Sequence, residues 1–233
     1  MTNIPNHIAI IPDGNRRWAK QHHLLAWRGH KEGVERFHEV ADVVFKHRVP
    51  YLTFWAASED NLTKRSKHEV RFLVSLLKDW LRRELDTKDL VKNETKFRFI
   101  GRWRSILPGH DELGTLARAL EEQTERFKKR NLTILFGYDG QREMIEAIKK
   151  IKKDPATEVN DGVLRKALWT GVLPPVDLVV RTGGEPHWSA GFMMWQTANA
   201  QFAFTQTLWP AFKKKELEAI LDDFSKRERR FGK

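Results

Sequence analysis

An aspartate, a glycine and two arginines stand together near the start of the chain, in the run Pro12-Asp13-Gly14-Asn15-Arg16-Arg17-Trp18. Backbone N–H groups at a glycine turn that leads into a helix suit a phosphate, and the two arginines add charge-assisted hydrogen bonds. Mg²⁺ is commonly bound by one or two carboxylates and by phosphate oxygens of the substrate, which makes Asp13 a candidate ligand. The run predicts a magnesium and phosphate site. An Asp-Gly turn with solvated arginines is the alternative that its spacing leaves open.

Further polar segments follow two other predicted strands. The run Ser58-Glu59-Asp60-Asn61 follows the second, and Arg181-Thr182-Gly183-Gly184-Glu185-Pro186-His187-Trp188-Ser189 follows the fifth. The segment 28–30 lies close enough along the chain to fold back on the first turn. Open α/β folds bind ligands beyond the carboxyl ends of their strands, so we expect these segments to converge on one rim.

Short apolar runs alternate with amphipathic stretches. The runs predict strands over 7–11, 51–56, 97–100, 132–136, 177–181 and 202–205. The stretches predict helices over 31–46, 67–85, 111–128, 142–152, 161–170 and 214–230. This alternation is typical of an α/β fold with a mainly parallel six-stranded sheet flanked by helices. Because no repeat or linker divides the chain, we expect a single domain over residues 1–233.

The composition narrows the possible functions. The 233 residues include 42 Lys and Arg against 31 Asp and Glu, a net charge of +11, and no cysteine. The missing cysteines exclude a disulfide framework, a thiolate zinc site and a cysteine nucleophile, and they fit a reducing compartment. The positive charge suits nucleic acid, anionic lipid or a small polyanion, or is a solvated surface. We predict no signal peptide or membrane span, and therefore a cytoplasmic protein.

Common nucleotide and hydrolase motifs are missing. The sequence holds no GxxxxGK[ST] loop, no GxGxxG after a strand, no HExxH and no GxSxG. Phosphate binding through the familiar nucleotide modules is therefore not expected.

Six segments, in order over nearly the whole chain, resemble the cis-prenyltransferases, the undecaprenyl diphosphate synthase family. They are HIAIIPDGNRRWAK (7–20), GHKEG (29–33), SEDN (58–61), DLVVRTGGE (177–185), MMWQTANAQFAFTQTLWPAF (193–212) and RERRFG (227–232). The resemblance implies the α/β fold of that family, a homodimer and Mg²⁺ dependence. It also implies that an allylic prenyl diphosphate is elongated with isopentenyl diphosphate to form Z double bonds.

The resemblance assigns roles by position. Asp13 matches the essential carboxylate that works with magnesium, and Ser58 and Asn61 match the pair near the condensing carbons, with Asn61 often assigned to proton removal. The residues expected to bind substrate are Gly14, Asn15, Arg16, Arg17, Trp18, Arg28, His30, Asp60, Lys64, Arg181, His187, Ser189, Arg230 and Gly232. Among them, Arg181 and Ser189 would hold isopentenyl diphosphate. The motif containing Arg230 would close over a diphosphate, across the dimer interface.

A growing isoprenoid is wholly apolar and needs an apolar tunnel. The candidates for its walls are Phe54, Trp55, Leu73, Leu76, Leu77 and Trp80. Ordinary core packing is the alternative for each of them.

Several positions depart from the family pattern. His187 stands where arginine is usual, and Gln201 stands where a glutamate commonly helps bind magnesium. Ala26, Leu62, Lys64 and the segment 139–141 also differ. Arginine binds phosphate through two parallel hydrogen bonds and keeps its charge, whereas histidine is charged only below an ordinary pKa of about 6.5. Two interpretations stay open: neutral drift in an ordinary elongase, or a dimethylallyl diphosphate acceptor in a non-head-to-tail, lavandulyl-type condensation.

Two other function classes are less favoured. A non-catalytic partner subunit has no reason to keep the polar set Asp13, Asn15, Arg16, Arg17, Asn61 and Arg181. The basic residues are spread among predicted helices without a nucleic-acid motif, so we expect no nucleic-acid partner. The lysine-rich segments 149–153 and 213–215 are left as solvated surface or as peripheral contacts with an anionic membrane.

Overall fold

The computed structural model describes residues 3–107 and 109–227, so the predicted site residues Arg230 and Gly232 lie outside the described residues. One six-stranded sheet forms the centre of the molecule, in the order β3-β4-β2-β1-β5-β6, and all its described pairings are parallel. The strands are β1 (His7–Ile11), β2 (Tyr51–Ser58), β3 (Thr95–Ile100), β4 (Arg130–Tyr138), β5 (Leu178–Arg181) and β6 (Gln201–Phe204). The α/β prediction is confirmed.

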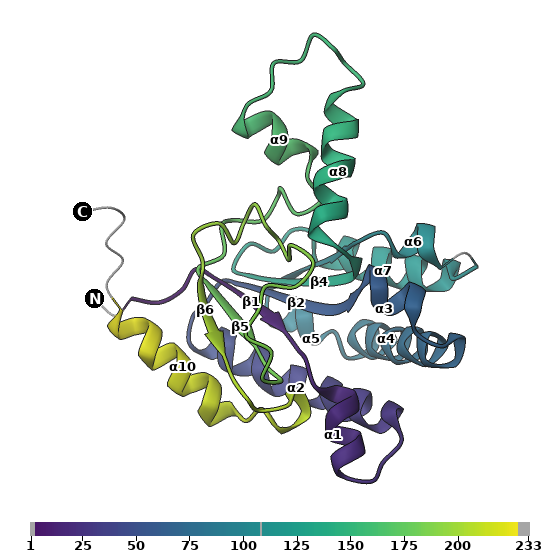
Figure 1. The fold of residues 1–233 in the computed structure, drawn as a ribbon, viewed down its shortest axis with the longest axis vertical. Helices are drawn as coiled ribbons and strands as arrows, with labels where there is room; N and C mark the ends of the chain where they lie inside the picture. The colour runs from purple at the N-terminus through teal and green to yellow at the C-terminus, as the bar shows by residue number, and fades with distance from the viewer. Residues whose placement is uncertain (1–2, 108, 228–233) are drawn as a thin grey trace.

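The strands alternate with helices, as Figure 1 shows. These are α1 (Asn15–Gln21), α2 (Ala26–Lys46), α3 (Glu59–Lys64), α4 (Lys67–Thr87), α5 (Asp89–Lys92), α6 (Trp103–Ile106), α7 (Asp111–Thr124), α8 (Gly140–Ile151), α9 (Asp161–Ala167) and α10 (Lys214–Lys226). The 3₁₀ turn η1 (Trp209–Ala211) precedes α10. The helices α1, α3, α5 and α6 were not predicted, because four to seven residues are too few for a helical period to emerge.

Three predicted helices end clearly earlier than expected. The helix predicted over 214–230 ends at Lys226, because Arg227 takes an extended conformation. The helix predicted over 111–128 ends at Thr124, whose buried hydroxyl donates to Leu120 O and accepts from the N–H of Phe97 on β3. The helix predicted over 161–170 ends at Ala167, because Leu168 takes an extended conformation. Tertiary contacts, which periodicity does not record, decide these ends.

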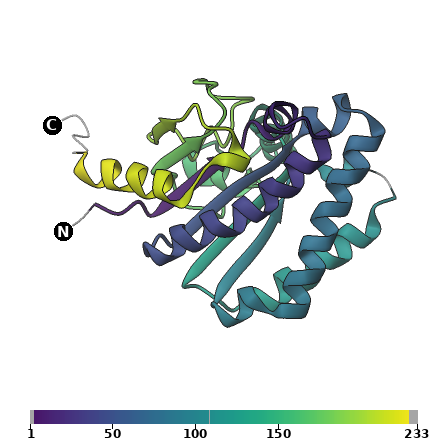
Figure 2. The same ribbon diagram turned by 90° about the horizontal axis from the view of Figure 1, so that it is seen from below.

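The main core lies between the sheet and the helices α2, α4, α7 and α10. Figure 2 shows α10, α2 and α4 lying in succession across this face, in agreement with their contacts. Strand side chains alternate between the two faces, so that Ile8, Ile10 and Phe54 belong to this core. Apolar positions at helical spacing, such as Val70, Val74 and Leu81 on α4, complete it from the helix side.

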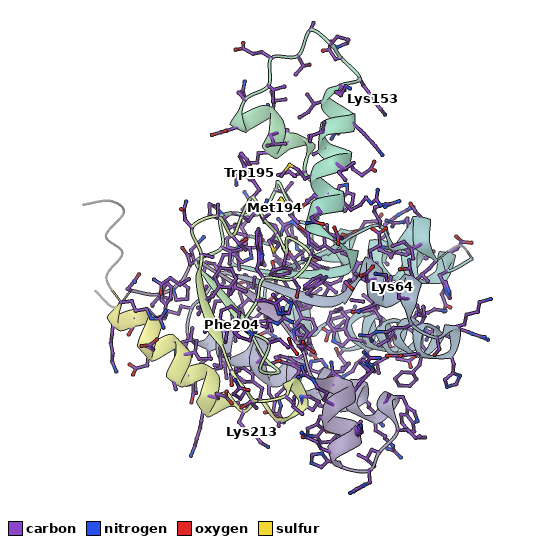
Figure 3. The ribbon with its side chains drawn as sticks, in the orientation of Figure 1. Lys64, Lys153, Met194, Trp195, Phe204 and Lys213 are labelled. Carbon is purple, nitrogen blue, oxygen red and sulfur yellow. The ribbon has the colours of Figure 1, made fainter. Side chains whose placement is uncertain are left out.

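The opposite face of the sheet is covered mainly by the segment 168–200. Ile11, Trp55 and Tyr138 pack there against Phe192 and Met193 in a second core. The helices α8 and α9 and the connection between them project from this side as an arm (Figure 1). Figure 3 places Lys153 on the arm and Lys213 at the far side of the body, so the two lysine-rich segments do not form one surface. No helix within the described residues is long and apolar enough to cross a membrane.

Candidate functional site

A polar cavity of about 450 Å³ lies beyond the carboxyl ends of β1, β2, β4 and β5. Its lining combines the segments that the sequence expected to converge. The predicted site residues among them are Asp13, Asn15, His30, Ser58, Asp60, Asn61, Arg181, His187 and Ser189. Parallel strands carry these residues to one rim because their carboxyl ends all point in the same direction.

The Asp13 carboxylate is held between two guanidinium groups. Oδ1 lies 3.2 Å from Arg17 Nη2, and Oδ2 lies 3.2 Å from Arg181 Nη2. Arg17 also approaches Glu185, at 3.8 Å. Gly183 permits this packing, because its φ is +92° and a Cβ there would lie 2.6 Å from Arg17 Nη2. The cluster therefore has cations on both sides of a carboxylate.

Arg181 is the buried cation of the cavity. Its residue is 5% exposed, and Nη1 donates to His187 O over 2.7 Å and to the Ser189 hydroxyl. Its Nε has no hydrogen-bond partner. A buried N–H without a partner is costly, so this atom is a donor available to a ligand or to water.

The short helix α3 positions Ser58 and Asn61 through its cap. Asn61 N donates to Ser58 Oγ over 3.0 Å, and Ser58 N donates to Asn61 Oδ1 over 3.3 Å, which is a reciprocal capping box. Glu59 ties the helix to the turn between β3 and α6 through an ion pair with Arg102 at 3.2 Å. Both predicted catalytic side chains thus have a structural role in addition to their place at the cavity.

Arg65, which the sequence reasoning missed, lines the cavity in place of Lys64. Its side chain is 18% exposed and its guanidinium lies 2.9 Å from Glu69 Oε1, whereas the Lys64 side chain is 72% exposed, pairs with Asp60 and does not line the cavity. The chain becomes extended at Arg65 where α3 ends, which turns consecutive side chains in different directions. The basic run 64–67 was the signal, but spacing cannot tell which of its members faces inward.

His30 lies near Arg65 on the wall of the polar cavity. Its Nε2 is 3.4 Å from Glu69 Oε1. Burial, together with the nearby positive charges of Arg65 and Arg16, lowers the pKa of His30 to about 4, although Glu69 acts in the opposite direction. At neutral pH His30 is therefore an uncharged hydrogen-bonding group.

Six predicted substrate-binding residues within the described part of the chain do not line the polar cavity: Gly14, Arg16, Arg17, Trp18, Arg28 and Lys64. Arg16 and Arg28 are exposed, and Arg28 lies over the ring of Trp27 at 4.4 Å. Trp18 stacks on His22 at 4.2 Å in a neighbouring surface depression. Lys64 is exposed, and Arg17 lines the same depression as Trp18 while its guanidinium pairs with Asp13. Gly14 acts through the backbone, because at φ +111° it lets Leu208 pass where a Cβ would lie 2.8 Å away.

Gln201 lies away from the cavity within one chain. It begins β6 and pairs with Leu178 at the amino ends of the strands, whereas Asp13 follows the carboxyl end of β1. Its Oε1 accepts from Arg227 Nη1 over 3.1 Å. The expectation that Gln201 bears on the acceptor half of the site therefore finds no contact within the described part of a single chain.

Other departures from the family pattern have local structural reasons. Asp139 caps α8, its Oδ1 accepting from Arg142 N over 2.8 Å. A Cβ at Gly140 would lie 1.8 Å from Gly191 O, so the residue must be glycine for the two segments to pass. Leu62 is buried and belongs to the main core.

An apolar cavity of about 90 Å³ adjoins the polar one and shares Pro12, Asn15, His30 and Ala56 with it. Of the predicted tunnel residues, it is lined by Phe54, Leu73, Leu76, Leu77 and Trp80. Trp55 is not among them. Neighbouring residues on a strand point to opposite faces, and Trp55 therefore packs in the second core and borders the polar cavity.

The donor set fits Mg²⁺ only together with a diphosphate. No group of three or more His, Cys, Asp or Glu residues suited to a metal occurs within residues 3–107 and 109–227. Asp13 supplies a carboxylate, and the buried Asn15 Oδ1, without a hydrogen-bond partner, is a second oxygen on the same cavity. Mg²⁺ is commonly bound by few protein oxygens, with phosphate oxygens and water completing the octahedron.

Comparisons with known proteins agree with this geometry. Residues 11–232 match a family model described as "Putative undecaprenyl diphosphate synthase". The isoprenyl transferase of Rickettsia bellii is 38% identical over 233 residues, all of both chains, and that of Thermotoga maritima is 36% identical, covering 98% of this chain and 97% of that one. Both relatives match over nearly their whole length.

Two solved structures have the same fold. Lavandulyl diphosphate synthase from Lavandula x intermedia, in complex with dimethylallyl diphosphate, has a TM-score of 0.90 at 31% identity over 99% of both chains. A "probable undecaprenyl diphosphate synthase" from Campylobacter jejuni has a TM-score of 0.79 at 28% identity over 100% of both chains.

Proposed function

The chain belongs to the undecaprenyl diphosphate synthase family of cis-prenyltransferases, and on that premise we propose that it condenses an allylic prenyl diphosphate with isopentenyl diphosphate. The observation that carries the proposal is the junction of the two cavities. The polar one offers cations for diphosphates, and the apolar one, reached past Pro12 and Ala56, suits a prenyl tail. A substrate with a charged head and an apolar tail fits this pair of cavities, and residues 1–233 then act as one catalytic domain.

The proposed reaction exchanges one bond for another. The allylic C–O bond breaks and diphosphate leaves with the electron pair, while a C–C bond forms to the terminal methylene carbon of isopentenyl diphosphate. A proton is then lost from C2 of the acceptor, which produces the Z double bond. It goes to an oxygen of the released diphosphate, because Ser58 and Asn61 are too weakly basic to hold it and instead orient the reacting carbons.

The preorganised cations supply the main catalytic effect in this proposal. Arg17, Arg65 and Arg181 surround the polar cavity or its carboxylate, so the charge that develops on the leaving diphosphate is stabilised without rearrangement. Asp13 and Asn15 would hold Mg²⁺, which neutralises diphosphate charge when bound.

The apolar cavity must widen as the product grows. Its 90 Å³ is smaller than the roughly 150 Å³ engineered cavity that binds a benzene. The wall formed by Leu73, Leu76 and Trp80 comes from α4, which therefore has to move relative to the sheet.

The test is incubation of the purified protein with MgCl₂, with geranyl, farnesyl or geranylgeranyl diphosphate, and with isopentenyl or dimethylallyl diphosphate. Products are identified by mass spectrometry and NMR, and a parallel series contains EDTA in place of MgCl₂. We expect Z-elongated products only with magnesium. No product from any pair of substrates would refute the proposal, and equal turnover in EDTA would remove magnesium from it.

A lavandulyl-type condensation is the second candidate. It is favoured by the TM-score of 0.90 to a synthase solved with dimethylallyl diphosphate, and by His187 at the acceptor half of the cavity. A branched product from dimethylallyl diphosphate alone would establish it, whereas a linear Z product would exclude it as the main activity.

We further propose a homodimer that uses the open edge of the sheet. The edge strand β6 carries Phe202 and Phe204, which stack at 5.7 Å, and Phe204 is 43% exposed and labelled in Figure 3. An apolar edge strand is a ready surface for pairing. Light scattering should give twice the mass of 27.4 kDa, and a monomer at micromolar concentration would refute the pairing.

A further inference from the structure

Three polar side chains of the segment after β5 form a chain of contacts that leads from the protein surface to Arg181, the buried cation at the end of β5. Glu185 Oε2 lies 3.7 Å from His187 Nδ1, and His187 Nε2 lies 2.9 Å from Ser189 Oγ. Ser189 Oγ in turn accepts a hydrogen bond from Arg181 Nη1. His187, Ser189 and Arg181 all line the polar cavity.

The direction of these bonds depends on the donor inventory and on the tautomer of His187. A guanidinium only donates, so the Ser189 oxygen must accept from Arg181. The Glu185 carboxylate, 3.7 Å from Nδ1, favours the neutral tautomer with its proton on Nδ1, and Nε2 then accepts from the Ser189 hydroxyl. In this state Ser189 has no proton to donate into the cavity.

Protonation of His187 reverses its bond to Ser189. An imidazolium donates from both nitrogens, so Nε2–H donates to the serine oxygen, which has two lone pairs and still accepts from Arg181. The Ser189 hydroxyl is then free to donate to an anion in the cavity. The charged groups that face His187 are Glu185 on its own segment, Arg181 at the end of β5 and Arg17 from α1, which approaches Glu185 at 3.8 Å.

We propose that His187 is a positioning residue that makes diphosphate binding proton-linked, by switching the Ser189 hydroxyl from a bond with the imidazole to a bond with a diphosphate oxygen. The inference rests on the proposed function for the identity of the diphosphate. An arginine at this position would keep its charge at all accessible pH values and would remove the switch. The side chain of His187 is 57% exposed, so protons reach it directly from solvent.

The first experiment needs no turnover. Inorganic pyrophosphate is titrated into the wild type, His187→Arg and Ser189→Ala at pH 7.5 by calorimetry, in buffers of different ionisation enthalpy. On binding pyrophosphate, the wild type should take up a fraction of a proton more than His187→Arg does. The ionisation of pyrophosphate itself is the same in both titrations, so the difference reports on His187. Ser189→Ala should lose this excess although it retains the histidine. Equal uptake by the wild type and His187→Arg overturns the inference, and full wild-type uptake by Ser189→Ala overturns the role of the hydroxyl.

The second experiment separates acceptor binding from chemistry. The KM for isopentenyl diphosphate is measured from pH 5.5 to 8.5 with saturating allylic substrate. As pH rises, the wild type should lose one charged hydrogen bond to the diphosphate, and its KM should rise about tenfold more than the KM of His187→Arg does. The kcat values of the two proteins should change with pH in the same way. Identical KM profiles contradict the switch.

These results test the switch separately from the proposed function. Proton-linked pyrophosphate binding without any prenyl product refutes the proposed function and leaves the switch. Product formation without a proton-uptake difference between the wild type and His187→Arg refutes the switch and leaves the proposed function. Thermal melting of each variant confirms that all three proteins are folded.

Discussion

Replacing Asp13 tests whether the carboxylate between two arginines serves catalysis rather than folding. Asp13→Ala removes the partner of Arg17 and of Arg181, each at 3.2 Å. The Arg17 pair is exposed enough to contribute less than about 1 kcal/mol. Arg181 is buried, but it keeps its bonds to His187 O and Ser189 Oγ. We therefore expect a total loss of stability of about 1–2 kcal/mol.

That loss corresponds to a fall in Tm of roughly 2–8 °C for a chain of this size. The effect on activity should be much larger. Without Asp13, Arg17 and Arg181 lose the carboxylate that both contact, and the carboxylate proposed to hold Mg²⁺ at the diphosphates is gone. We therefore expect kcat/KM to fall at least about 1000-fold. A change of this size equals about 4 kcal/mol in the transition-state free energy.

Two variants complete the assay. Asp13→Asn keeps the shape and removes the charge, and it should be almost as inactive as Asp13→Ala. Asp79→Ala is the matched control, because it removes an exposed Asp–Arg pair, with Arg82 at 2.9 Å, on α4 away from the polar cavity. Product formation is measured by mass spectrometry and folding by thermal melting. If Asp13→Ala retains more than a tenth of the wild-type kcat/KM, the catalytic role of Asp13 is refuted. If Asp13→Ala shows no cooperative melting transition, Asp13 is required for folding instead.

Three further changes test other parts of the structure. Arg65→Ala should raise the KM for the diphosphate substrates about tenfold and more than Lys64→Ala does, since only Arg65 lines the cavity; the reverse order in steady-state kinetics would favour Lys64. Burial raises the pKa of Glu84 to about 7 in the folded protein. The folded state therefore binds this proton more tightly than the unfolded state, and the resulting stabilisation is complete below the ordinary pKa of a glutamate and is lost as pH rises through 7. Glu84→Gln should therefore gain up to about 3 kcal/mol of unfolding free energy relative to the wild type between pH 4.5 and pH 8, and a constant difference in urea titrations would contradict this. Trp80→Ala should lengthen the longest product seen by mass spectrometry, whereas Leu81→Ala, which is buried beside it but does not line the apolar cavity, should lower the Tm without lengthening it.

Local patterns were sufficient for the long elements of the fold. The strand β1 was predicted with its observed bounds, and α4 begins at the predicted Lys67, because an unbroken apolar run or a helical period is visible in the residues themselves. The short α3 was missed. Its capping box binds Ser58 to Asn61 over a single turn, which produces no periodic pattern.

The candidate site was only partly predictable for the same reason. Asp13, Ser58 and Arg181 follow strands, and the parallel sheet brings them to one cavity as expected. Lys64 and Arg65 are both basic, but their side chains point in different directions, which their residue types do not reveal. Trp55 and Phe54 are neighbours in sequence, but the strand sends them to opposite faces, and only Phe54 reaches the apolar cavity.

The sequence by itself determined the α/β class, the family and the polar groups that follow the strands, because these depend on residue types and their order. The tertiary structure alone decided which cations surround Asp13, where Gln201 lies and how His187 is joined to Ser189 and Arg181. The physical reason is that hydrogen bonds and ion pairs act over about 3 Å between side chains that can be distant in the chain, and only packing sets those distances.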